Sequence, residues 1–123
     1  MVITLQWADS FAREWVDAWN AHDLPRVLSH YTEDFEMISP FIVQFTGEAS
    51  GMLVGKNKVG SYWRAALEKF PNLQFDLHGV FVGASSVVIH YRTSFGPCAA
   101  EVLFVDSSGL VYRAAANYQW PLN

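Results

Sequence analysis

The side chains with the clearest chemical potential lie in the second half of the chain, where Asp76, His78, His90 and Arg92 alternate with apolar residues. Two imidazoles and a carboxylate are common metal ligands. A three-residue loop at 83–85 would, however, pair Asp76 with Arg92 on the outer face of a sheet, and the same register would set His78 opposite His90. Because an arginine would repel a cation, the pattern favours an exposed ion pair beside two solvated imidazoles. We therefore predict no metal site.

Glu101 is the only charged residue in the strand-like run 98–105, whose two faces are about equally apolar. A two-residue turn at Gly96-Pro97 would place it on the outer face beside Arg92, as an ordinary ion pair. A loop one residue longer would point it into the apolar interior. There desolvation would raise the pKa of the carboxyl group, and Glu101 could serve as a catalytic general acid or base. The residues alone leave both registers open.

Aromatic residues make up 15% of the chain and include five tryptophans. Rings of this size need a large cavity or a partner surface to cover them, so their number favours a small-molecule pocket. For any single ring, a plain core position is the commoner role. Taken together, the aromatic residues on inward faces, and one hydroxyl that could bond a carbonyl, are the predicted substrate-binding set: Trp15, Trp19, Tyr31, Ser39, Tyr62, Trp63, Tyr91 and Tyr118.

Three helices are predicted in the first 70 residues. Apolar residues recur at helical spacing over 7–21, with two indoles on the buried stripe. Asp23 can cap a short second helix with Pro25 in its first turn, and Asn57 can cap a third that ends before Pro71. Residues 35–39 alternate as a short strand. Residues 41–45 have strand-like composition and lead into a turn-rich segment that could form a lid or an edge hairpin.

Four strand-like runs follow, at 73–82, 86–95, 98–105 and 110–119, separated by glycine-containing turns. Strand parity places Leu73, Phe75, Leu77 and Phe81 together on the inner face. Helices first and an antiparallel meander afterwards predict an α+β fold, and 123 residues suit one domain spanning 1–123.

Bulk properties exclude several functions. The net charge is −4, and no cluster of lysine or arginine is present, which argues against a nucleic-acid partner. No apolar run is long enough to span a bilayer, so no membrane partner is expected. The first residues lack a secretory pattern, and Cys98 is the single cysteine. These features predict a cytoplasmic protein.

Several strings resemble the SnoaL-like branch of the nuclear transport factor 2 superfamily. They stand at 15–24 (WVDAWNAHDL), 31–34 (YTED), 39–40 (SP), 55–56 (GK), 70–75 (FPNLQF) and 106–112 (DSSGLVY). The resemblance implies a cystatin-like cone, or α+β barrel. In it, three N-terminal helices pack in the concavity of a strongly curved, mainly antiparallel sheet and leave a deep pocket. It also implies a homodimer through the outer sheet face, for which Val88, Val102 and Phe104 supply apolar surface.

The superfamily includes polyketide cyclases, ketosteroid isomerase, scytalone dehydratase and limonene-epoxide hydrolase, besides pure binding modules. By similarity to ketosteroid isomerase, its oxyanion tyrosine corresponds to Trp15, its general-base aspartate to Ser39 and its protonated acid to Glu101. Two of these three positions have lost the group, which argues against steroid isomerisation. We predict a pocket for a small apolar ligand with Glu101 as acid/base catalyst of an isomerase, cyclase or hydrolase-like reaction, and no cofactor. The alternative is a non-catalytic ligand-binding or dimerisation module.

Overall fold

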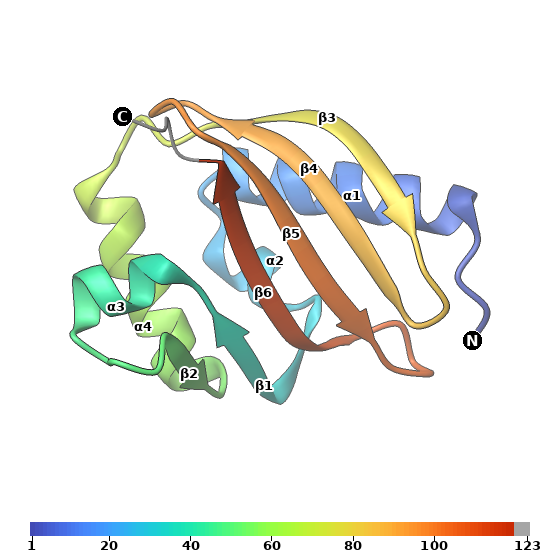
Figure 1. Ribbon diagram of the computed structural model, residues 1–123, viewed down its shortest axis with the longest axis horizontal. Helices are drawn as coiled ribbons and strands as arrows, with labels where there is room; N and C mark the ends of the chain where they lie inside the picture. Colours follow the sequence, from blue (N-terminus) through green and yellow to red (C-terminus); the bar gives the residue numbers. More distant parts are fainter. Residues whose placement is uncertain (120–123) are drawn as a thin grey trace.

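The computed structural model describes residues 1–119, in which helices occupy the concave side of one curved sheet (Figure 1). Caps and periodicity set most element boundaries. The elements, in chain order, are α1 (Leu5–Asn20), α2 (Leu24–Leu28), β1 (Tyr31–Ile38), α3 (Pro40–Thr46), β2 (Met52–Val54), α4 (Lys56–Lys69), β3 (Phe75–Val82), β4 (Ser86–Thr93), β5 (Cys98–Val105) and β6 (Val111–Gln119).

The sheet has the strand order β2-β1-β6-β5-β4-β3 across residues 1–119. The pair β1–β6 is parallel, and every other neighbouring pair is antiparallel. In Figure 1, α1 lies behind β3 and β4, whereas α3 and α4 gather at the end formed by β1 and β2. The predicted α+β class with N-terminal helices and a mainly antiparallel sheet is confirmed. No helix within the described residues is long and apolar enough to cross a membrane.

The first helix forms because its apolar residues fall on one stripe and its first turn is capped. The Thr4 hydroxyl accepts a hydrogen bond from the Trp7 amide at 3.0 Å, which begins α1 two residues earlier than predicted. Asp23 caps α2 as expected. The helix α4 begins at Lys56 after Gly55, not after the predicted cap Asn57.

The predicted strand at 41–45 is wrong: these residues form α3. Ser39 caps this helix by accepting a hydrogen bond from the Phe41 amide at 3.2 Å, and Pro40 occupies the first turn, where its fixed φ suits a helix. Gly47 ends the helix with a φ of 77°, a left-handed conformation that favours glycine. Capping therefore outweighed the β-propensity of the aromatic and β-branched residues between them, and the described chain has four helices instead of three.

The predicted register of β3 and β4 holds at one end and shifts at the other. Leu77 pairs with Tyr91 as expected, but a bulge between Leu77 and Gly79 sets Gly79, not His78, opposite His90. Beyond the bulge, strand parity is inverted. Phe81, which was expected on the inner face, is therefore 62% exposed, while Val80 packs against the core.

The expected ion pair between Asp76 and Arg92 does not form, although the two residues are paired in the ladder. The Asp76 carboxylate lies 3.5 Å from Nε2 of His78. Arg92 instead donates a hydrogen bond from Nη1 to the carbonyl oxygen of Gly96 at 3.2 Å.

Candidate functional site

A cavity of about 290 Å³ lies between the helices and the inner face of the sheet. Its wall combines side chains from α1, α3, α4 and the inward positions of β1 and β3–β6. Eight of the nine residues predicted for the site line it: Trp15, Trp19, Ser39, Tyr62, Trp63, Tyr91, Glu101 and Tyr118. The ninth, Tyr31, is not among the lining residues.

Glu101 faces the cavity because of the connection between β4 and β5. Residues 94–97 form a longer link than the two-residue turn considered above, and Arg92 pairs with Cys98 instead of Glu101. In this register the inward residue Ile89 lies opposite Glu101, whose side chain is only 3% exposed. Of the two registers that the sequence left open, the inward one is observed, and no ion pair with Arg92 forms.

The Glu101 carboxyl group is held by a tyrosine in a largely apolar wall. The Tyr91 hydroxyl donates a hydrogen bond to Oε1 of Glu101 at 3.0 Å. Within residues 1–119, no basic side chain lies within ion-pair distance of it. Burial raises the pKa of Glu101 from 4.5 to about 7, and the Tyr91 hydrogen bond offsets only part of this effect. Near neutral pH, the carboxyl group therefore exists in both protonation states.

Glu101 and Tyr91 form a polar patch on the cavity wall, and further hydroxyl groups extend it. The hydroxyl of Ser39 interacts with those of Tyr62 and Tyr118, and the hydroxyl of Tyr118 interacts with that of Tyr91. Burial raises the pKa of Tyr62 to about 12 and also raises the pKa values of Tyr91 and Tyr118. The three tyrosines are therefore neutral hydrogen-bonding groups at physiological pH, and Glu101 is the one group in this cluster that titrates near neutrality.

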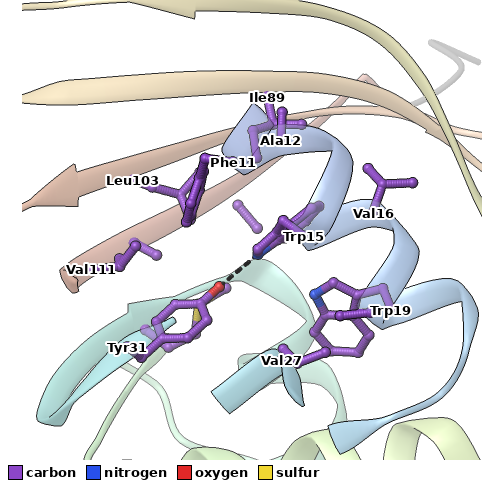
Figure 2. Close-up of a cluster of buried hydrophobic side chains, with 14 of the residues drawn as sticks. Phe11, Ala12, Trp15, Val16, Trp19, Val27, Tyr31, Ile89, Leu103 and Val111 are labelled. Carbon is purple, nitrogen blue, oxygen red and sulfur yellow. Dashed lines mark hydrogen bonds between the residues drawn. The ribbon is translucent and has the colours of Figure 1, made fainter. Parts of the chain in front are cut away.

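Tyr31 lies behind the cavity wall, where it supports Trp15. Figure 2 shows the bond between them: Nε1 of Trp15 donates to the Tyr31 hydroxyl at 2.9 Å. Tyr31 begins β1 and packs against Phe35 and Trp63, with ring centroids 4.4 and 5.3 Å away. The Trp15 N–H is thus already paired inside the core. Trp15 presents apolar ring surface to the cavity, and Tyr31 fixes the orientation of that ring.

Trp19 differs from Trp15 in its hydrogen bonding. Its ring lies nearly perpendicular to Trp63, with centroids 5.0 Å apart, and both rings line the cavity. The buried Nε1 of Trp19 has no hydrogen-bond acceptor among the described residues. A buried donor without an acceptor costs roughly 1–3 kcal/mol, so this edge of the wall would gain from an added acceptor.

The sequence analysis missed the aromatic rim of the cavity. Phe41, Gln44 and Phe45 reach it from α3, while Phe70 and Phe95 come from the end of α4 and the β4–β5 loop. Phe70 and Phe95 stack at 6.1 Å, and Phe95 is 47% exposed. Positions 41, 44 and 45 have the i, i+3, i+4 spacing that places side chains on one face of a helix, which was the available signal for this rim. The prediction of a strand at 41–45 hid that signal.

An α+β cone with an apolar cavity and one buried carboxyl group defines the class of this protein. The profile of the SnoaL-like domain matches residues 12–117, and the chain belongs to the SnoaL-like family. The crystal structure of a SnoaL-like protein of unknown function from Burkholderia thailandensis is similar at 49% identity. The match covers 98% of this chain and 100% of that one, with a TM-score of 0.94.

More distant structures share the fold. A protein of unknown function with a cystatin-like fold from Methylobium petroleophilum is 18% identical, with a TM-score of 0.77 over 100% of this chain and 82% of that one. A candidate isomerase of the SnoaL-like family from Agrobacterium tumefaciens is 17% identical, with a TM-score of 0.75 over 94% and 100% of the two chains. No curated protein matches the chain.

Proposed function

We propose that this protein binds a compact, apolar cyclic molecule in its cavity and that Glu101 acts on the ligand as a general acid/base. The observation that carries the proposal is the buried Glu101 carboxyl group, held by Tyr91 and titrating near pH 7. A catalytic acid or base works best when its pKa lies near the operating pH. A structural carboxylate would be expected instead to have a basic partner.

The wall chemistry indicates the ligand class. About 290 Å³ lies at the small end of the range for ligand sites, roughly 300–1,000 Å³, which suits one or two fused rings. The indoles of Trp15, Trp19 and Trp63 offer flat apolar surface. The tyrosine hydroxyls and Ser39 offer hydrogen bonds at one side, so a cyclic ketone with a single polar edge matches the wall best.

The reaction class that fits is proton transfer at a carbon next to a carbonyl group. The Glu101 carboxylate would take the carbon-bound proton while tyrosine hydroxyls hydrogen-bond the oxygen of the resulting enolate. The protonated carboxyl group would then return the proton to the same or another carbon. The candidate isomerase from Agrobacterium tumefaciens supports this class by fold alone.

The experiment is hydrogen–deuterium exchange of compact cyclic ketones in D₂O, followed by NMR, with ligand binding followed by tryptophan fluorescence. Glu101→Gln should slow exchange at least ~100-fold and leave fluorescence quenching within about threefold of the native protein. Glu68→Gln, an exposed carboxyl on α4, is the matched control and should change neither. Native exchange no faster than that of Glu101→Gln would contradict the catalytic role.

A non-catalytic binding module is the second candidate. One observation favours it: besides Glu101, the titratable groups of the polar patch are tyrosines whose raised pKa values keep them protonated. A single proton-transfer group suits fewer reactions than a pair. Tight binding of a ketone, measured by fluorescence quenching, together with a hydrogen–deuterium exchange rate that no variant alters, would favour the binding module.

The proposal includes a cytoplasmic homodimer. Half-buried Val88 and Val102 pair on the outer face of β4 and β5, next to Phe104, and exposed apolar surface of this kind favours association. Sedimentation of Val102→Glu should give a monomer if these residues form the interface. An unchanged dimer would place the interface elsewhere.

A further inference from the structure

We propose that His78, His90 and Cys98 form a binding site for a divalent zinc-like metal ion on the outer face of the sheet. One ligand atom from each of the three residues lies within 4.8 Å of the others. The prediction against a metal considered the histidines with Arg92 and did not include Cys98. Bringing in a thiol from the next strand changes the chemistry of the cluster.

Strand geometry assembles the three residues from neighbouring strands. His78, His90 and Cys98 come from β3, β4 and β5, and alternation along β5 turns Cys98 away from the cavity that Glu101 faces. The bulge in β3 sets Gly79 opposite His90. The two imidazoles consequently meet edge to face, with centroids 5.3 Å apart.

Two imidazole nitrogens and a thiolate are a ligand set that zinc and cobalt accept, with a fourth position left for water or a carboxylate. In the single chain, His78 is exposed and His90 and Cys98 are half-buried. The cluster lies two or more residues beyond the proposed dimer contact at Val88 and Val102, so an ion can reach it from solvent. In Figure 1, α1 lies behind β3 and β4, which leaves the other side of these strands uncovered by helices. Ligand atoms within 4.8 Å need only small rotamer changes to close around one ion.

The surrounding charges are compatible with a cation. The Asp76 carboxylate lies 3.5 Å from Nε2 of His78, where it adds negative charge and can orient the imidazole. Arg92 was the argument against a metal, but its guanidinium is hydrogen-bonded to the carbonyl oxygen of Gly96 in the β4–β5 loop. That bond directs the arginine along the strand toward the loop.

The test is titration of the full chain with Co²⁺ under a phosphine reductant, because a thiolate ligand gives a sulfur-to-cobalt charge-transfer band. We expect one Co²⁺ per chain, a band that Zn²⁺ removes by competition, and loss of the band in Cys98→Ala. His90→Asn should weaken binding more than ~100-fold, and Asp76→Asn about 10-fold. None of these residues lines the cavity, so ketone binding should stay unchanged.

His30→Gln is the matched control, because this histidine lies beside Glu14 on another part of the fold and should leave the Co²⁺ band intact. Circular dichroism checks that each variant is folded. If Cys98→Ala does not fold, His78→Gln provides a second ligand deletion. Cobalt binding without a charge-transfer band, or an affinity that none of these ligand variants alters, would overturn the proposal. So would the absence of stoichiometric binding by the native chain.

Discussion

Two glutamates in this fold experience opposite environments. Glu101 lies in the apolar cavity, where burial raises its pKa to about 7. Glu14, on the outward side of α1, accepts hydrogen bonds from Nε of Arg26 at 2.8 Å and from His30 at 3.1 Å. These partners, Arg26 foremost, lower the pKa of Glu14 to about 2. The same carboxyl group is thus made easy to protonate in one place and hard to protonate in the other.

The contrast distinguishes a carboxylate held in an ion pair from one that can exchange a proton near neutral pH. Glu14 is fully ionised at neutral pH, and its charge is matched by the guanidinium of Arg26, so it has no proton to exchange in that range. Glu101 has its charge opposed by burial and is close to half protonated. A perturbed pKa in a cavity marks a candidate functional group, and the cause of the shift is desolvation at Glu101 but an ion pair at Glu14.

The largest expected effect is on the pH dependence of stability. The folded pKa of Glu101 lies above its unfolded value of 4.5, so protonation of this group stabilises the folded state. This stabilisation is complete below pH 4.5 and is lost as pH rises through about 7. That loss amounts to about 3 kcal/mol. Glu101→Gln should remove this dependence. Urea unfolding at about pH 5 and about pH 8 measures it, and an equally steep decline in the variant would refute the assignment.

The next effect is on the Glu101 pKa itself. Because the Tyr91 hydrogen bond lowers that pKa, Tyr91→Phe should move it above about 7. Loss of the bond should also destabilise the fold by about 1–2 kcal/mol once the carboxylate is ionised. Carbon-13 NMR titration of the Glu101 carboxyl group measures the shift. Tyr112→Phe, at an exposed tyrosine on β6, is the control, and a pKa that falls would contradict the model of the site.

The smallest effect belongs to Glu14. Its side chain is 38% exposed, so solvent screening limits the contribution of its ion pair to about 1 kcal/mol. Because its folded pKa lies below 4.5, this stability is present at neutral pH and is lost as pH falls from 4.5 through about 2. Glu14→Gln should therefore lower stability at pH 7, by less in high salt. Thermal unfolding at two salt concentrations tests this, and a salt-independent loss would indicate a packing effect instead.

Most of the fold could be predicted from the sequence because helical and strand periodicities are strong. Apolar periodicity marked α1, a cap at Asp23 marked α2, and alternation marked the strands from β3 to β6. The failures arose where two local preferences compete. Residues 41–45 have strand composition, yet Ser39, Pro40 and Gly47 impose a helix. The bulge in β3 reversed the face of Phe81, and Gly79, an isolated glycine within the strand pattern, was the signal that could have located it.

The candidate site was predicted by residue type more fully than by arrangement. The aromatic wall followed from which faces carry rings. The orientation of Glu101 could not follow, because β5 is apolar on both faces and parity gives no preference there. It depends on the length of the β4–β5 connection, which a glycine and a proline leave undetermined. The role of Tyr31 as a support for Trp15 depends on packing depth, which periodicity does not report.

The position of β6 has a consequence for how the protein is made. This strand lies between β1 and β5, and among the strands of residues 1–119 it alone joins the pair β2-β1 to the meander β5-β4-β3. A ribosome releases β1 long before residues 111–119 exist, so during synthesis β1 presents an unpaired edge next to half-formed helices. The sheet can close only after the last strand emerges. We therefore expect nascent chains in which residues 111–119 have not yet emerged to be prone to aggregate or to bind chaperones.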